Sequence, residues 1–405
     1  MALGNIYYFN PTCELAVANG SFSYQPPLLL QEMEHELAIL PFIFCSENDF
    51  VLAESKPNEI FLQQLKNVGF NLPYFYNLAE LEAMPEGSFN QIIPWGWSPS
   101  AHYKFSRLKE KCSPEFKKSP VYSWHEVHKT LYERSASLSF LHTILDSNTD
   151  ENLITKDLTG TIVNSINEIE TLLQKHKQLV IKAPLSSSGR GIQMIRKPEL
   201  DKARKQWIGG VLKQQNYLVA EPLLEKKIDF SFQFRITSEK EVDFLGLSFF
   251  ETNSNGQYQR TLINPNPELL LKTRNCAHLI EKMYFIAGKI QNELINSAYL
   301  QHYRGYLGID AMIFEYQNKS LIHPCVEINS RMNMGILTKF LERKIYPESS
   351  GTFELFYGSP GQFSSFINDK IANQQQLGIH SRILPLTEGL PDTKFGAYAS
   401  VCGPR

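Results

Sequence analysis

The sequence predicts an α/β domain at the N-terminus, followed by a larger region of the α+β class. Over the first 115 or so residues, short apolar runs alternate with helical patterns, as in a small α/β unit. Strand patterns dominate between residues 179 and 329, with one long helical stretch among them. A chain of 405 residues is also too long for one ordinary core, so two or three structural units are expected.

The N-terminal unit combines short apolar runs, which suit strands, with longer amphipathic runs, which suit helices. Strands are predicted at residues 6–9, 40–44, 49–52 and 91–94, and helices at residues 27–37 and 59–68. A polar stretch at residues 111–120 contains two prolines and predicts the linker that ends this unit.

Beyond the linker, a long helical pattern at residues 123–145 leads through a polar loop at 146–151 into an amphipathic helix at 164–175. Strands are then predicted at residues 179–183, 193–196, 217–220, 230–237, 241–250, 305–315 and 321–329. Further helices are predicted at residues 268–297 and 335–343, and the last 60 residues carry turn signals and strand-like segments.

The overall charge and the cysteine pattern exclude several classes of protein. The formal net charge is −2, which gives no electrostatic footprint for a nucleic acid or a membrane surface. The six cysteines are scattered without a C-x-x-C pair, and no apolar run is long enough to span a bilayer. We therefore expect a soluble, cytoplasmic, reduced protein that binds neither nucleic acid nor a membrane, with a homo-oligomer left open.

The first stretch that carries chemistry is a strand that delivers Lys182 to a loop of small residues. The loop contributes three hydroxyls and two glycines, at Ser186, Ser187, Ser188, Gly189 and Gly191. Glycines let backbone amides approach an anion, and a lysine supplies a point charge suited to phosphate. No Gly-Lys-Ser/Thr and no helix follows, so this is not a Walker loop. Read alone, the stretch fits a flexible β-turn equally well.

The second stretch is a strand that ends in Glu221, makes a short crossing and resumes with Asp229. Such a crossing can offer backbone groups to a purine edge and a carboxylate to ribose hydroxyls. Taken alone, the stretch is better explained by an ordinary connection between strands with solvated charges.

The third stretch lies on two late strands. Residues two apart on a strand share a face, so Glu327, Asn329 and Arg331 are expected to project together. Asp310 would join them from the neighbouring strand. Two carboxylates and a carboxamide form a hard-oxygen set appropriate to Mg²⁺, and a guanidinium beside it suits a transferring phosphoryl group. The alternative is an amphipathic strand whose polar face meets water.

Two N-terminal loops also follow predicted strands, at Asn10-Pro11 and at Trp95-Gly96-Trp97. Ligands usually sit at the carboxyl ends of strands in an open α/β sheet. Turn chemistry combined with aromatic packing is the interpretation we favour for both loops.

Taken in order, the three stretches resemble the ATP-grasp superfamily over roughly residues 123–343. That resemblance implies an N-terminal α/β domain over residues 1–115, a first ATP-grasp subdomain over 121–220 and a second over 221–345. A C-terminal extension would occupy residues 346–405.

The resemblance also implies roles for the residues of the three stretches. Lys182 is similar to the family's phosphate-contacting lysine, and Ser186–Gly191 resembles the mobile loop over the phosphates. Glu221 and Leu224 match the adenine hinge, and Asp229 matches the acid near the ribose. The metal ligands would be Asp310, Glu327 and Asn329, with catalytic roles for Lys182 and Arg331. For the family's second phosphate-binding cation, which lies upstream, the candidates are Lys129 and Arg134.

The implied activity is that of an ADP-forming ligase that uses ATP with Mg²⁺, or with Mn²⁺ in its place. The substrates would be small molecules or peptide-like, and a substrate carboxylate would be phosphorylated and then attacked by an amine or a thiol. A phosphotransferase that leaves the phosphate on its product, and a sensor or scaffold that binds ATP without turnover, are the alternatives.

Overall fold

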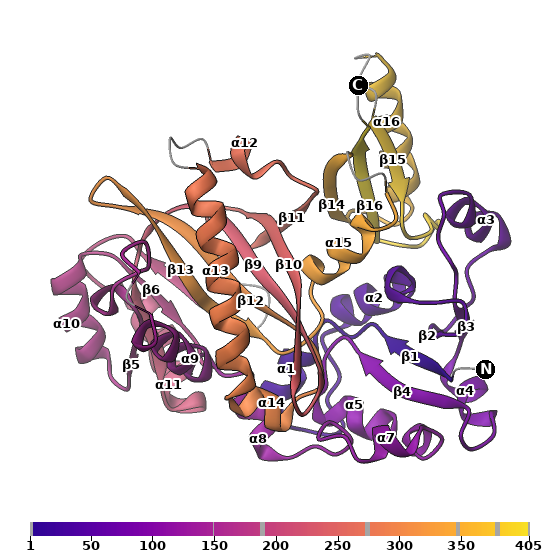
Figure 1. Cartoon of the computed structure of the whole chain (residues 1–405), viewed down its shortest axis with the longest axis horizontal. Helices are drawn as coiled ribbons and strands as arrows, with labels where there is room; N and C mark the ends of the chain where they lie inside the picture. The colour runs from indigo at the N-terminus through magenta and orange to yellow at the C-terminus, as the bar shows by residue number, and fades with distance from the viewer. Residues whose placement is uncertain are drawn as a thin grey trace.

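The computed structural model describes residues 3–148, 150–186, 191–271, 276–345, 349–376 and 381–403. Within these ranges the chain forms one parallel and two antiparallel sheets, packed with helices (Figure 1). The predicted combination of α/β and α+β architecture is therefore confirmed. No helix in the described ranges is long and apolar enough to cross a membrane.

The N-terminal domain is built on a four-stranded parallel sheet in the order β3-β2-β1-β4. Its strands are β1 (Gly4–Tyr8), β2 (Phe50–Leu52), β3 (Tyr74–Tyr76) and β4 (Phe89–Pro94). The helices are α1 (Cys13–Asn19), α2 (Leu28–Glu36), α3 (Glu59–Asn67), α4 (Leu78–Ala83), α5 (Pro99–Lys104) and α6 (Ser106–Lys109). Because the strands are parallel, the segments that follow β1, β2 and β4 meet at one edge of the sheet.

Two predictions for this domain are wrong. Residues 40–44 form a 3₁₀ helix, η1 (Leu40–Phe44), in place of a strand. All five of its residues are buried, so the run lacks the alternation that separates a half-buried strand from a buried helix, and Pro41 favours the start of a helical turn. The expected linker at 111–120 instead contains α7 (Pro114–Lys117), and the buried side chains of Cys112 and Phe116 belong to the core.

The long helix predicted at residues 123–145 is divided in two. It consists of α8 (Glu126–Thr130) and α9 (Arg134–Asp146). The backbone of Glu133 is extended, which interrupts the helical path, and Glu133 is the N-cap residue of α9. This break matters for the site, because it places Arg134 at the first position of α9 with its side chain buried.

The second sheet is antiparallel, in the order β5-β8-β6-β7. It comprises β5 (Thr161–Val163), β6 (Leu179–Lys182), β7 (Ile192–Ile195) and β8 (Leu218–Pro222). Helices α10 (Ile166–His176) and α11 (Lys202–Gln215) pack on it through Ile169, Leu173 and Ile208, which share one apolar cluster with the strands.

The third sheet has eight antiparallel strands in the order β13-β12-β9-β10-β11-β14-β16-β15. The strands are β9 (Glu225–Ser238), β10 (Glu241–Thr252), β11 (Tyr258–Ile263), β12 (Gly305–Tyr316), β13 (Lys319–Asn329), β14 (Ser350–Tyr357), β15 (Ser381–Pro385) and β16 (Phe395–Cys402). The helices of this region are α12 (Pro267–Leu271), α13 (Cys276–Ile295), α14 (Ala298–His302), α15 (Met334–Glu342) and α16 (Gln362–Gln376). The sheet thus draws on residues assigned both to the second subdomain and to the C-terminal extension, and the four-part division stays a prediction.

Strand β9 shows how alternation separates the core from the site. Phe230, Phe232 and Phe234 are fully buried in the apolar cluster that includes α13. Successive side chains of a strand point to opposite faces, so Ser231 and Gln233 lie on the other side of the sheet. That polar face is the one that Asp310 joins, since Asp310 on β12 is the register partner of Ser231.

Candidate active site

All three predicted metal ligands come together on the hairpin of β12 and β13. Asp310 and Glu327 are register partners, and Asn329 lies two residues further along β13 on the same face. The Asn329 Nδ2 donates a hydrogen bond of 2.9 Å to Asp310 Oδ2. All three residues, together with Arg331, line a cavity of about 280 Å³. We call this the central cavity.

Of the two carboxylates on this hairpin, Glu327 is paired with Arg134, whereas Asp310 makes no ion pair within 4.0 Å among the described residues. Burial and the neighbouring charge of Glu327 raise the pKa of Asp310 to about 7, although the hydrogen bond from Asn329 opposes the shift. Among the described residues no group of three or more His, Cys, Asp or Glu side chains is arranged to hold a metal. The donor set of two carboxylates and one carboxamide fits Mg²⁺ only if phosphate oxygens or waters complete its coordination.

The raised pKa of Asp310 predicts how the stability of the ligand-free protein depends on pH. The folded state retains a proton between the ordinary pKa of 3.8 and the folded value of about 7. The free energy of unfolding therefore falls as the pH rises through that window, and the penalty is complete above it. Asp310→Asn should remove a penalty on the order of 4 kcal/mol. Urea unfolding should show Asp310→Asn to be more stable than wild type at pH 8, with little difference near pH 4. An equal change at both pH values would contradict this origin.

Arg331 is held against the N-terminal domain by Glu14, the second residue of α1. The Arg331 Nε lies 2.8 Å from Glu14 Oε1, and Nη2 donates to Glu14 Oε2 at 3.2 Å. Nη2 also donates to Asn329 Oδ1, and Nη1 donates to the carbonyl of Met332. A guanidinium carries five N–H groups, so Nη1 still has a donor for a phosphate oxygen. The pairing with Glu14 fixes the side chain beside Asn329.

The two N-terminal loops, at Asn10-Pro11 and at Trp95-Gly96-Trp97, hold the segment that follows β13 in place. The side chain of Asn10 exchanges hydrogen bonds with the backbone of Gly96, and the Met332 amide donates to the Trp95 carbonyl at 2.7 Å. A Cβ on Gly96 would lie 2.3 Å from the Sγ of Cys13 and 3.1 Å from the Cβ of Arg331. Glycine is therefore required where the loop after β4, helix α1 and the Arg331 backbone meet. Turn chemistry and packing account for these loops, and both serve the position of Arg331.

Arg134 connects the second sheet to the carboxylates of the third. Its Nη1 lies 2.9 Å from Glu327 Oε2, and its Nε donates to the carbonyl of Ala183 at 3.0 Å. A third contact runs from Nη2 to the Ser186 Oγ, at 3.3 Å. Of the two upstream candidates, it is Arg134 that reaches the central cavity.

Lys182 and Glu221 form a buried ion pair between β6 and β8. The Lys182 Nζ lies 2.6 Å from Glu221 Oε2, but the contact lacks hydrogen-bond geometry, so among the described residues the ammonium has unused donors. Strand β13 approaches the pair at His323, whose pKa burial lowers to about 4, with the Lys182 charge adding to the effect and Glu221 opposing it. A buried ammonium with unused donors is suited to an anionic ligand such as a phosphate.

The remaining predicted residues make other contacts. Asp229 accepts hydrogen bonds at its Oδ2 from Lys226 and from Thr252, at 2.6 and 2.8 Å. Leu224 packs against the main apolar cluster, at the turn between β8 and β9. A Cβ on Gly191 would lie 2.3 Å from that of Ser186, so these two ends of the loop touch. The other predicted loop residues, Ser187, Ser188 and Gly189, lie outside the described residues.

Sequence reasoning did not assign a role to Glu14, although it is the acid that holds Arg331. The signal available was its place just after β1, where ligand-binding residues of parallel sheets gather. Its partner comes from 317 residues further along the chain, so only the folded structure reveals the contact.

Comparison with known proteins agrees with this architecture. No protein-family model matches the sequence, and no curated protein matches it. An N5-carboxyaminoimidazole ribonucleotide synthetase solved as its ADP complex has a TM-score of 0.51 at 11% identity, covering 98% of this chain and 92% of its own. The synthetase of the same name from Thermus thermophilus has a TM-score of 0.50 at 11% identity, with 99% and 94% covered.

A third similar structure is the N5-carboxyaminoimidazole synthetase from Staphylococcus aureus in complex with ADP, with a TM-score of 0.49 and 13% identity over 100% of this chain and 95% of its own. At such identities the likeness concerns the fold. The chain has the ATP-grasp fold.

Proposed function

We propose that this protein is an ADP-forming ligase that activates a substrate carboxylate as an acylphosphate, which an amine or a thiol then attacks. The observation that carries the proposal is the convergence of Asp310, Glu327, Asn329 and Arg331 on one cavity. Arg134 ties this group to the loop that follows Lys182. A pure nucleotide binder has no need of this set.

The fit of ATP and a divalent cation rests on the donors that the protein leaves unused. ATP would supply the phosphoryl group, and Mg²⁺, or Mn²⁺ in its place, would neutralise the phosphate charge. We propose Asp310, Glu327 and Asn329 as the metal ligands, because all three line one cavity and the two carboxylates are close enough for the charge of Glu327 to raise the pKa of Asp310. Lys182 and Arg331 would hold the phosphates and stabilise the charge that develops during transfer.

The nucleoside would lie between the second and third sheets. We propose that Glu221 and Leu224 border the adenine and that Asp229 approaches the ribose, with Ser186, Ser187, Ser188, Gly189 and Gly191 over the phosphates. Glu221 would also position Lys182, since the two already form an ion pair. No protein nucleophile is needed, because positioning and electrostatic stabilisation accomplish phosphoryl transfer.

The fold does not identify the substrates. Solved proteins of this fold include complexes with ADP, which supports a nucleotide site here and leaves the carboxylate and the acceptor open. We also propose a cytoplasmic location. The described cysteines Cys13, Cys45, Cys112, Cys325 and Cys402 carry free thiols, which suits a reducing compartment.

The products formed from ATP should distinguish a ligase from its alternatives. The purified protein would be incubated with ATP, Mg²⁺ and pooled carboxylates and amines, and ADP and free phosphate would be measured. Equal amounts of ADP and phosphate, dependent on the pool, are the result expected for a ligase. ADP with a phosphorylated metabolite would instead indicate a phosphotransferase, and nucleotide binding without turnover would indicate a sensor.

A further inference from the structure

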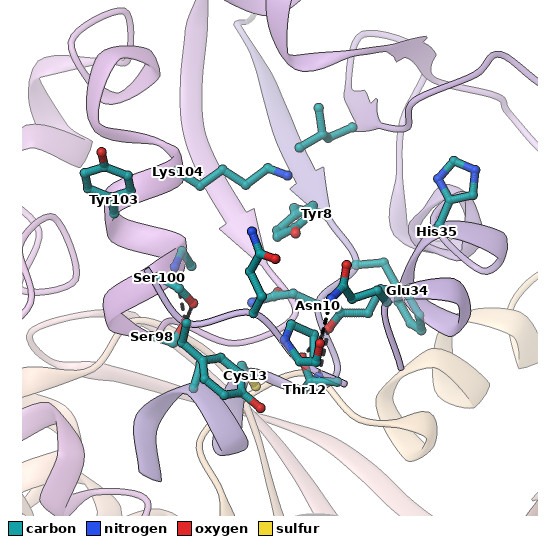
Figure 2. Close-up of a pocket in the computed structure, with 18 of the residues that line it drawn as sticks. Tyr8, Asn10, Thr12, Cys13, Glu34, His35, Ser98, Ser100, Tyr103 and Lys104 are labelled. Atoms are coloured by element: carbon teal, nitrogen blue, oxygen red, sulfur yellow. Dashed lines mark hydrogen bonds between the residues drawn. The ribbon is translucent and has the colours of Figure 1, made fainter. Parts of the chain in front are cut away.

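A second cavity, of about 510 Å³, lies within the N-terminal domain at the carboxyl edge of its parallel sheet (Figure 2). We call it the N-terminal cavity. Tyr8 and Leu52 line it from the ends of β1 and β2, and Ser98 lines it just after β4. The carboxyl edge of a parallel sheet is where open α/β folds bind ligands, because helix starts and strand ends converge there. None of the residues proposed for phosphoryl transfer lines this cavity.

Charged side chains of opposite sign face each other across the N-terminal cavity. Lys104 extends from α5 over the ring of Tyr8, with its Nζ 4.8 Å from the ring centroid (Figure 2). Glu34 stands on α2 at the opposite wall, and Glu54 lines the cavity after β2. Among the described residues, Lys104 makes no ion pair within 4.0 Å. Burial lowers its pKa, and the two carboxylates oppose that shift. We call the Lys104 ammonium the positive pole of the cavity and the Glu34 carboxylate its negative pole.

The negative pole is fixed in place by the start of α1. The amide and the hydroxyl of Thr12 both donate to Glu34 Oε1, at 3.1 and 2.6 Å. These two donors would otherwise be available to an anion at this corner. Because Glu34 already uses them, the corner favours a cationic group.

One segment separates the N-terminal cavity from the central cavity. Phe9 lines both cavities, Asn10, Thr12 and Cys13 line the N-terminal one, and Pro11 and Glu14 line the central one. A group bound at Glu34 beside Thr12 is therefore separated by a single chain segment from Glu14 and Arg331. The negative pole lies at this partition, while Lys104 stands on a different wall (Figure 2).

We propose that the N-terminal cavity binds a zwitterion of the amino-acid type, with its ammonium at Glu34 and its carboxylate at Lys104. This inference goes beyond the proposed function and does not depend on it. Two carboxylates against one ammonium disfavour a phosphate or another dianion. Tyr24 and Tyr103, which also line the cavity, provide ring surfaces for the rest of the ligand.

Direct binding tests the proposal without requiring catalysis. Each of the twenty protein L-amino acids would be titrated against the full-length protein by ligand-observed NMR. At least one should bind, and Glu34→Gln and Lys104→Met should each weaken that binding by about 10- to 100-fold, as expected for a lost charge-assisted contact. Glu86→Gln and Lys66→Met serve as matched controls, since both are exposed residues outside the cavity, and should bind as wild type does. Thermal melting would verify that every variant is folded.

The binding experiment is independent of turnover, so failure of this proposal and failure of the proposed function can be told apart. No amino acid bound by wild type, or the same affinity in both cavity variants, overturns the proposal while leaving the ligase function standing. Binding that is lost in both cavity variants supports the proposal, whatever the ADP-release assay shows.

Discussion

Glu327→Gln is expected to reduce Mg²⁺-dependent ATP turnover by at least roughly 100-fold while leaving the chain folded. Even the loss of a group that only supports a metal ligand typically costs about 10- to 100-fold, and here an anionic ligand itself would be lost. The fold should survive, because Gln can still accept the contact that Arg134 makes at 2.9 Å. Removing the charge also relieves Asp310, whose pKa that charge helps to raise.

A matched control for this variant is Glu315→Gln. Glu315 lies on the adjacent strand β12 and forms an ion pair with Lys227 at 2.8 Å, far enough toward the hairpin end to leave the central cavity unchanged. It should keep normal turnover and normal dependence on Mg²⁺ concentration. Near-normal activity of Glu327→Gln, with an unchanged Mg²⁺ titration, would remove Glu327 from the metal site.

Arg331→Met is expected to lower both turnover and stability. Removing one preorganised cation from a site of phosphoryl transfer should cost about 10²- to 10³-fold in kcat. Glu14 would be left unpaired with only 8% of its side chain exposed, and such an uncompensated charge typically costs about 3–5 kcal/mol. Urea unfolding and the ADP-release assay would measure the two effects separately.

The double variant Glu14→Gln, Arg331→Met separates structure from catalysis. Without the buried charge, most of the lost stability should return, because a neutral pair no longer carries the desolvation penalty. Turnover should stay low. A double variant as unstable as the single one would show that the Glu14 charge is not the cause, and recovered turnover would exclude Arg331 from the reaction.

The strand that carries Glu327 and Asn329 could be predicted because its signal is local. Glu327 and Asn329 lie on one strand with period-two alternation, and β9 separates its phenylalanines from its polar residues by the same rule. Lys182 likewise precedes its loop within a single strand. In each case a strand and its neighbours along the chain contain the whole pattern.

The contacts that complete the site could not be predicted, because their partners are distant in sequence. Glu14 reaches Arg331 across 317 residues, and Arg134 meets Glu327 only after α9 packs on β13. The break before α9 was also missed, since the helical pattern continues through it. The 3₁₀ helix at residues 40–44 was missed because its five residues are buried on all sides.

The most direct test of the central claim is capture of the acylphosphate. Hydroxylamine would be added with ATP, Mg²⁺ and pooled carboxylates, and hydroxamates, nucleotides and phosphate would be analysed by mass spectrometry. The proposed reaction predicts one hydroxamate, formed in equal amounts with ADP and free phosphate and absent from Glu327→Gln. Formation of AMP and pyrophosphate, or of ADP with a stable phosphorylated product and no hydroxamate, would contradict it.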